Sequence, residues 1–96
     1  MSVRLVISIA AAPGKGAELL KAMAERCRTS QGDQGCEQFE VFQSALDPDR
    51  LCLLEKWASV EDLAAHAKLQ AARPALPEGL RLGGGEREDY EYNRTR

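Results

Sequence analysis

Apolar and polar residues alternate near the start of the chain, and this alternation predicts a strand over residues 3–9. One face of the strand carries the apolar side chains Val3, Leu5, Ile7 and Ile9. After a Pro-Gly break, apolar residues recur every three or four positions from residue 16 to about 29, which predicts an amphipathic helix. Its apolar stripe consists of Leu19, Leu20, Met23, Ala24 and Cys27.

Two further strands, over residues 36–44 and 51–57, are predicted to form a hairpin around an Asp-Pro-Asp turn. In the first strand, one face carries Phe39 and Val41, and the other carries Cys36 and Phe42. In the second strand, the side chains divide into Leu51, Leu53, Glu55 and Trp57 on one face and Cys52, Leu54 and Lys56 on the other. Both faces of the hairpin therefore carry apolar groups.

A second helix is predicted to begin after Ser59, a favourable N-cap residue, and to end before the prolines at 74 and 77. Its buried stripe is expected to consist of Val60, Leu63, Ala64 and Ala67, with His66 at the flank. A last strand is predicted over about 86–93, followed by a short tail over 94–96. The order β-α-β-β-α-β predicts a single α+β domain over residues 1–96, with a ferredoxin-like fold and an antiparallel sheet.

Helices on one side of such a sheet leave its other face bare, and here that face is expected to carry Val6, Phe42 and Leu54. An exposed apolar area of this kind marks an interface. A homodimer in which two sheets pack together as an α+β barrel would cover it.

Composition narrows the class of protein further. The 96 residues have 44% hydrophobic and 29% charged side chains and a net charge of −2. Without a basic stripe or a long apolar run, neither nucleic acid nor a membrane is expected as a partner. Cys27, Cys36 and Cys52 lack metal-ligand spacing, so we expect no metal site and interpret them as buried thiols of a cytoplasmic protein.

Five short segments resemble the antibiotic biosynthesis monooxygenase (ABM) family of dimeric α+β barrel proteins. They are residues 12–15 (APGK), 35–42 (GCEQFEVF), 47–49 (DPD), 55–59 (EKWAS) and 62–66 (DLAAH), within a resemblance that covers about residues 3 to 72. It implies an enzyme-sized pocket between helices and sheet. It also implies cofactor-independent oxygenation of a small phenolic, quinol or polyketide-like substrate, with dioxygen as co-substrate. The haem-degrading subgroup is unlike this chain, because Ile7, His66 and Leu76 stand where its Asn, Trp and His would be.

The candidate catalytic residue is His66, the one histidine of the chain, as general base or hydrogen-bond partner of a phenol. Trp57 matches the tryptophan that lines the pocket in ABM monooxygenases, and Leu53 replaces an Asn that some of them carry. Glu55 is either paired with an Arg or Lys, which we favour, or a functional carboxylate. Ser8 is a further candidate for substrate contact.

Two other functions fit the same residues. An isomerase or lyase acting on a small carbonyl metabolite could use His66 and Glu55 to move protons. A non-catalytic dimer that binds a small ligand would need a pocket alone.

Overall fold

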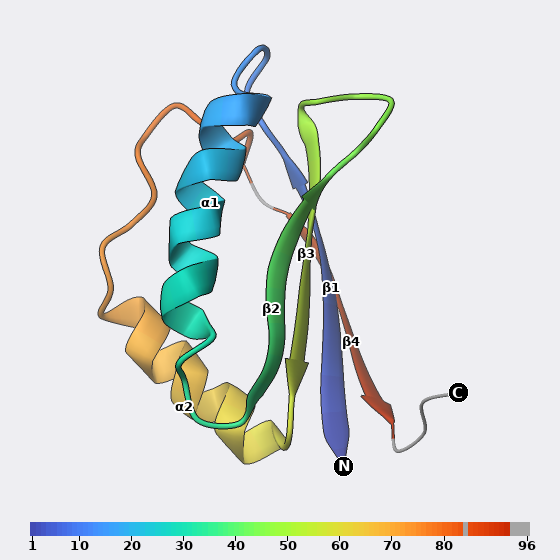
Figure 1. Ribbon diagram of the computed structural model, residues 1–96, viewed down its shortest axis with the longest axis vertical. Helices are drawn as coiled ribbons and strands as arrows, with labels where there is room; N and C mark the ends of the chain where they lie inside the picture. The colour runs from blue at the N-terminus through green and yellow to red at the C-terminus, as the bar shows by residue number, and fades with distance from the viewer. Residues whose placement is uncertain (84, 93–96) are drawn as a thin grey trace.

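The computed structural model describes residues 1–83 and 85–92. Its elements, in chain order, are β1 (Ser2–Ala10), α1 (Gly16–Ser30), β2 (Cys36–Gln43), β3 (Arg50–Trp57), α2 (Val60–Ala71) and β4 (Glu86–Tyr92) (Figure 1). The predicted β-α-β-β-α-β order is therefore confirmed, with boundaries that agree within two residues where the structure describes them. Position 93 of the predicted last strand and the predicted tail over 94–96 lie outside the described residues.

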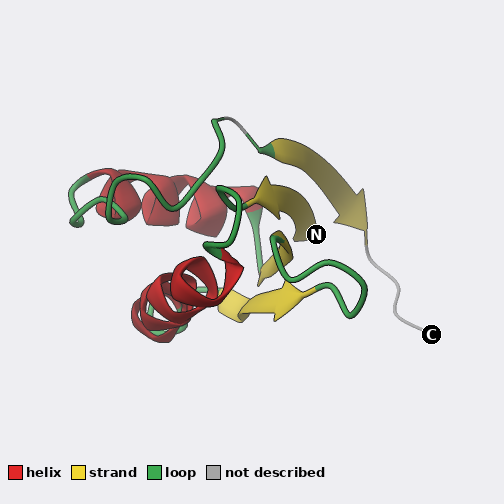
Figure 2. Ribbon diagram, turned by 90° about the horizontal axis from the view of Figure 1, so that it is seen from above, coloured by secondary structure: helices red, strands yellow, loops and turns green. Residues whose placement is uncertain are grey.

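The four strands form one antiparallel sheet in the order β2-β3-β1-β4. Both helices lie on the same side of this sheet, as Figure 2 shows from above, so the fold has two layers. The core lies between the layers and includes Val3, Leu5, Leu19, Met23 and Trp57. The ferredoxin-like α+β fold predicted from the sequence is thus confirmed.

Strand β3 shows the predicted division into two faces, because its alternate residues Leu51, Leu53, Glu55 and Trp57 are all buried. The register places Glu55 between Leu5 of β1 and Phe39 of β2. A carboxylate is therefore held in the middle of the sheet, on the face that the helices cover.

The face predicted for Cys36 is wrong. Cys36 pairs with Trp57 and packs against the core, and an irregularity follows in β2 between residues 36 and 38. An extra residue in one strand of a pair reverses the alternation of faces at that point. The alternation of side chains between the two faces therefore predicts the face of Phe39 and Val41 correctly and the face of Cys36, the first residue of the strand, incorrectly.

The buried stripe predicted for α2 is also wrong. His66, which was expected at the flank, is the buried residue of this helix. Leu63 is partly buried, whereas Val60, Ala64 and Ala67 are exposed and line a cavity instead of packing against the core. The helix does present an apolar face to the sheet, but it stands away from the sheet along that face.

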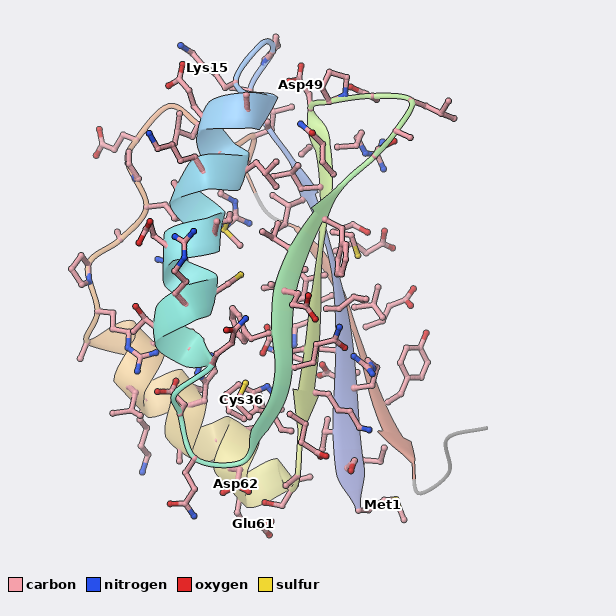
Figure 3. The ribbon with its side chains drawn as sticks, in the orientation of Figure 1. Met1, Lys15, Cys36, Asp49, Glu61 and Asp62 are labelled. Atoms are coloured by element: carbon pink, nitrogen blue, oxygen red, sulfur yellow. The ribbon has the colours of Figure 1, made fainter. Side chains whose placement is uncertain are left out.

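The start of α1 is fixed by the β2–β3 turn. Asp49 accepts hydrogen bonds from the backbone N–H groups of Gly14 and Gly16, both at 2.9 Å. A β-carbon at Gly16 would lie 1.9 Å from the carbonyl oxygen of Pro48, so this close approach requires glycine. Figure 3 shows Asp49 and Lys15 together at this end of the molecule.

The connection between α2 and β4 runs back along the outside of α1 (Figure 1). Leu80 is buried in the core, and its carbonyl oxygen accepts a hydrogen bond from the Ala12 N–H at 2.9 Å. The Leu82 N–H donates to the Ala10 carbonyl at 3.0 Å, and Arg81 pairs with Ala11 beyond the end of β1. These bonds hold Arg81 close to the sheet.

The face of the sheet turned away from the helices, called the outer face below, has no second layer over it (Figure 2). Its side chains include Val6, Ser8, Phe42, Leu54 and Tyr90, of which Phe42 and Tyr90 are about half exposed. None of the described helices combines the length and the apolarity needed to cross a membrane.

Candidate functional site

A cavity of about 730 Å³ lies between the inner face of the sheet and the two helices. This volume is within the range of small-molecule sites. Its apolar walls are formed by residues of β1, α1, β3 and α2, among them Leu5, Ile7, Met23, Leu53 and Leu63. One side of the cavity is formed by the face of α2 that carries Val60, Ala64 and Ala67. The cavity therefore lies where the sequence predicted that this face would pack against the sheet.

Glu55 lines this cavity and is 5% exposed. Its Oε1 atom accepts a hydrogen bond of 2.9 Å from the indole N–H of Trp57. Burial raises the pKa of the Glu55 carboxyl, while the Trp57 hydrogen bond and the nearby His66 and Arg87 oppose that rise. The Arg or Lys partner favoured for Glu55 is absent among the ion pairs of residues 1–83 and 85–92, so Glu55 is a buried carboxyl without a charged side-chain partner.

His66 lines the same cavity and is 7% exposed. Its ring lies against the indole of Trp57, with centroids 4.5 Å apart and a tilt of 32°, and against Phe39 at 5.3 Å. Trp57 is fully buried behind both groups. The Glu55 carboxyl and the His66 imidazole are therefore positioned by one indole.

Asp33 holds the other side of the imidazole. Its Oδ2 atom is 2.7 Å from His66 Nδ1, and the carboxylate also accepts two hydrogen bonds from the guanidinium of Arg73, at 2.6 and 2.9 Å. The Arg73 hydrogen bonds, and then His66, hold the pKa of Asp33 below its usual value. Because an ionised carboxylate can accept but not donate, we assign the proton to Nδ1, which leaves Nε2 of a neutral His66 as an acceptor.

Backbone geometry at Gly35 allows the turn that carries Asp33 to lie against α2. Gly35 has a φ of 78°, and a β-carbon there would lie 2.2 Å from Oδ2 of Asp62. Glycine is therefore required on both grounds. Figure 3 shows Cys36 and Asp62 at this end of the molecule, where β2 begins beside α2.

Four arginines line the cavity: Arg26 of α1, Arg73 and Arg81 of the connection after α2, and Arg87 of β4. Arg87 pairs with Asp89 at 3.0 Å, as Arg73 pairs with Asp33. The cavity thus combines apolar walls, two groups capable of proton transfer and an excess of positive charge.

Three of the five residues predicted from the sequence for the site line the cavity, namely His66, Glu55 and Leu53. Trp57 lies one layer behind it and contacts Glu55 and His66. Ser8 lies on the outer face, opposite Cys52 and beside a shallow hollow near the β2–β3 turn, so it does not reach the cavity. The catalytic and binding roles of these residues remain predictions.

Sequence reasoning missed Asp33, Arg73 and the other arginines. Asp33 sits in a Gly-Asp-Gln-Gly segment, where an Asp is ordinary turn chemistry. It is 33 residues from His66 and 40 from Arg73 in the chain. No local pattern connects such distant positions, and the fold alone brings them together.

Two of the three cysteines, Cys27 and Cys36, are poorly suited to nucleophilic chemistry. Cys27, Cys36 and Cys52 are free thiols, and burial raises the pKa of Cys27 and Cys36. A raised pKa disfavours the reactive thiolate. Among the described residues, no three His, Cys, Asp or Glu side chains are grouped so that they could hold a metal ion.

Solved structures with this fold come from several organisms. A protein from Methanosarcina mazei is 23% identical, with a TM-score of 0.80 over 97% of this chain and 94% of that one. A protein from Pseudomonas aeruginosa is 22% identical, with a TM-score of 0.79 over 97% and 95%. A putative antibiotic biosynthesis monooxygenase from Nitrosomonas europaea is 20% identical, with a TM-score of 0.77 over 93% and 88%. At these identities the likeness concerns the fold.

No curated protein matches the chain. The family model for antibiotic biosynthesis monooxygenase matches residues 2–76, which include both helices, the first three strands and the residues Asp33, Glu55, His66 and Arg73 of the site. The chain belongs to the antibiotic biosynthesis monooxygenase family.

Proposed function

We propose that the protein is a cofactor-independent monooxygenase that acts on a small phenolic, quinol or polyketide-like substrate, with dioxygen as co-substrate. One observation carries the proposal: Glu55 and His66 lie against the same indole and face one largely apolar cavity. Cofactor-free oxygenation needs such a cavity together with a base, because the substrate anion itself must reduce dioxygen.

In the proposed reaction, His66 Nε2 accepts a proton from the phenol or from the ring CH₂ of its keto tautomer. The resulting anion gives electrons to dioxygen, and a carbon–oxygen bond forms to yield a peroxide. The proton returns to the peroxide to give a hydroperoxide. The remaining hydrogen of that carbon then leaves as a proton while the oxygen–oxygen bond breaks, so that the carbon becomes a carbonyl and the departing hydroxide takes up the proton. One oxygen atom stays on the product and the other leaves as water.

Asp33 and Glu55 have different parts in this reaction. Asp33, ionised and held by Arg73, keeps the Nδ1 proton in place and stabilises the imidazolium that forms after proton transfer. Glu55, whose pKa is raised by burial, is the second group that can take or give a proton at the cavity wall. Apolar walls limit the access of water to the peroxide.

We also propose a cytoplasmic homodimer. The outer face offers Val6, Leu54, Phe42 and Tyr90 in neighbouring strands, and a second copy of the sheet would cover them. The free thiols fit a reducing compartment.

An isomerase or lyase acting on a small carbonyl metabolite is the second candidate. The observation that favours it is again the pair Glu55 and His66, because two proton-transfer groups on one cavity suit the transfer of a proton between neighbouring carbons. Both candidate reactions begin with deprotonation of the substrate. In the monooxygenase the resulting anion then reacts with dioxygen, whereas in the isomerase it takes up a proton at a neighbouring carbon.

Oxygen uptake with a panel of quinols and anthrone-type phenols, without added flavin or metal, separates the candidates. We expect uptake by the wild type and a loss of about 100-fold or more in His66→Ala. Lys68→Ala, an exposed change on the same helix, is the control and should leave uptake unchanged. Proton exchange on a hydroxy-ketone without oxygen uptake would support the isomerase instead, and binding without either activity would leave a ligand-binding protein.

A further inference from the structure

Two of the four described arginines that line the cavity form no ion pair with a described carboxylate. Within the described part of the chain, Arg26 donates one hydrogen bond, of 3.3 Å, to the carbonyl oxygen of Pro74, and Arg81 makes no side-chain hydrogen bond or ion pair. Glu78 lines a smaller hollow together with Arg26 and Arg81, but among the described residues it forms an ion pair with neither of them. Arg26 and Arg81 line both the cavity and the smaller hollow beside it. In agreement with this proximity, burial and then the charge of Arg81 lower the pKa of Arg26.

The charge that lines the cavity is therefore unbalanced. Asp33 neutralises Arg73, and Asp89 neutralises Arg87. The remaining carboxyl on the wall is Glu55, whose raised pKa favours its neutral form. Two positive charges are left beside an apolar surface, one on the partly buried Arg26 and one on the exposed Arg81, and an anionic group could pair with both.

The position of the Arg81 guanidinium relative to Glu55 can be derived from the register of the sheet. The Nη2 atom of Arg81 lies 3.5 Å from the point where a β-carbon of Gly85 would stand, and Ile7 Cγ2 lies 3.7 Å from the same point. Glu55 pairs with Leu5, two residues from Ile7, which is about 7 Å along the strand. An aromatic ring system carrying an acidic group would span that separation, with the apolar side chains of β1 and β3 beneath it.

Building on the proposed function, we propose that the substrate is an amphiphilic acid: an aromatic phenol whose carboxylate or other anionic group is bound by Arg26 and Arg81. Its phenolic ring lies over Leu5, Ile7 and Leu53. The phenol then faces Glu55 and His66, while the two guanidiniums fix the direction in which the ring enters. Neutral quinols of the same shape bind in the same cavity with lower affinity.

Binding of 6-hydroxy-2-naphthoate and of its uncharged amide, measured by isothermal titration calorimetry, tests this proposal. We expect the wild type to bind the acid about tenfold more tightly than the amide. Arg81→Gln and Arg26→Gln should each remove most of that preference, because each should lower the affinity for the acid and leave the affinity for the amide unchanged. Arg28→Gln removes an exposed charge from the same helix as Arg26, outside the cavity, and is the matched control.

Equal affinities for acid and amide in the wild type would overturn the proposal, as would the absence of saturable binding of the acid at about 1 mM. An equal loss of affinity for both ligands in Arg81→Gln would also overturn the proposal, because it would mean that the substitution removed an apolar contact and not a charge interaction. Because binding requires no turnover, a preference for the acid without oxygen uptake would reject the monooxygenase and leave the anion site standing.

Discussion

A carboxyl with a raised pKa, Glu55, and one with a lowered pKa, Asp33, stand on either side of the candidate base. Burial raises the pKa of Glu55 although the Trp57 indole N–H opposes the rise, whereas the Arg73 guanidinium lowers the pKa of Asp33. Pairs of titratable groups whose environments separate their pKa values commonly divide the acid and base roles of a site. Here the separation has two causes: burial, which raises the pKa of Glu55, and the hydrogen bonds from Arg73, which lower the pKa of Asp33.

Replacing Glu55 with Gln is expected to stabilise the protein near neutral pH. The folded wild type binds the Glu55 proton more tightly than the unfolded chain does, so the protonated carboxyl contributes to the stability of the wild type. This contribution is fully present below the usual carboxyl pKa and is lost as the pH rises through the raised pKa of the folded state. A neutral Gln can still accept the Trp57 hydrogen bond and avoids the buried charge. We expect a gain in the free energy of unfolding on the order of 1 kcal/mol at neutral pH.

Urea unfolding at about pH 4 and about pH 7.5 would measure this gain, which should disappear at the lower pH. Glu78→Gln, at an exposed position, is the control. A lower stability of Glu55→Gln at neutral pH would mean that the carboxylate charge is better compensated than the structure indicates.

Replacing Asp33 with Asn is expected to have the opposite pH dependence. The lowered pKa of Asp33 gives stability that is present above the usual carboxyl pKa and is lost as pH falls through the folded-state value. The free energy of unfolding of Asp33→Asn should be lower by about 1–3 kcal/mol at neutral pH, because Arg73 and His66 lose a charged acceptor. Unfolding curves across the acid range should show the difference shrink, and a constant difference would contradict the ion-pair account.

At the scale of elements, strand patterns predict faces well and helix patterns do not predict what a face meets. The alternation in β1 and β3 identified the core residues, since a sheet has two faces and one is covered. In α2 the stripe predicted to be buried is not buried: Ala64 and Ala67 line a cavity, and His66 is the buried residue. The distance between a helix and its sheet depends on the whole fold, so it cannot be predicted from the sequence pattern of a single helix or strand.

Filling the cavity from α2 should block binding with little effect on stability. Ala67 is exposed and lines the cavity, so Ala67→Phe should weaken the binding of hydroxynaphthoate by about tenfold or more and change the free energy of unfolding by less than about 0.5 kcal/mol. Ala65 is exposed on the same helix outside the cavity, and Ala65→Phe is the matched control. Similar affinities in the two variants would mean that the ligand binds elsewhere.

At the scale of the whole molecule, the outer face presents apolar side chains that no described element covers. The strands β1, β3 and β2 place Val6, Leu54, Phe42 and Cys52 side by side, with charged residues of β4 at one edge. Burying such a surface contributes about 25 cal/mol for each Å² of apolar area removed from water. The two apolar faces that the pattern predicted for the hairpin are thus present in the structure.

Charged substitutions on the outer face test the proposed homodimer. If two sheets pack together, Leu54→Glu and Phe42→Glu should convert a dimer into a monomer, because each would bury a carboxylate in an apolar interface. Leu46 is 97% exposed in the β2–β3 turn, and Leu46→Glu should leave the dimer intact. Size-exclusion chromatography with light scattering measures the masses. A monomeric wild type, or a dimer that Leu54→Glu and Phe42→Glu leave unchanged, would reject the sheet-to-sheet arrangement, and the cavity would then be complete within one chain.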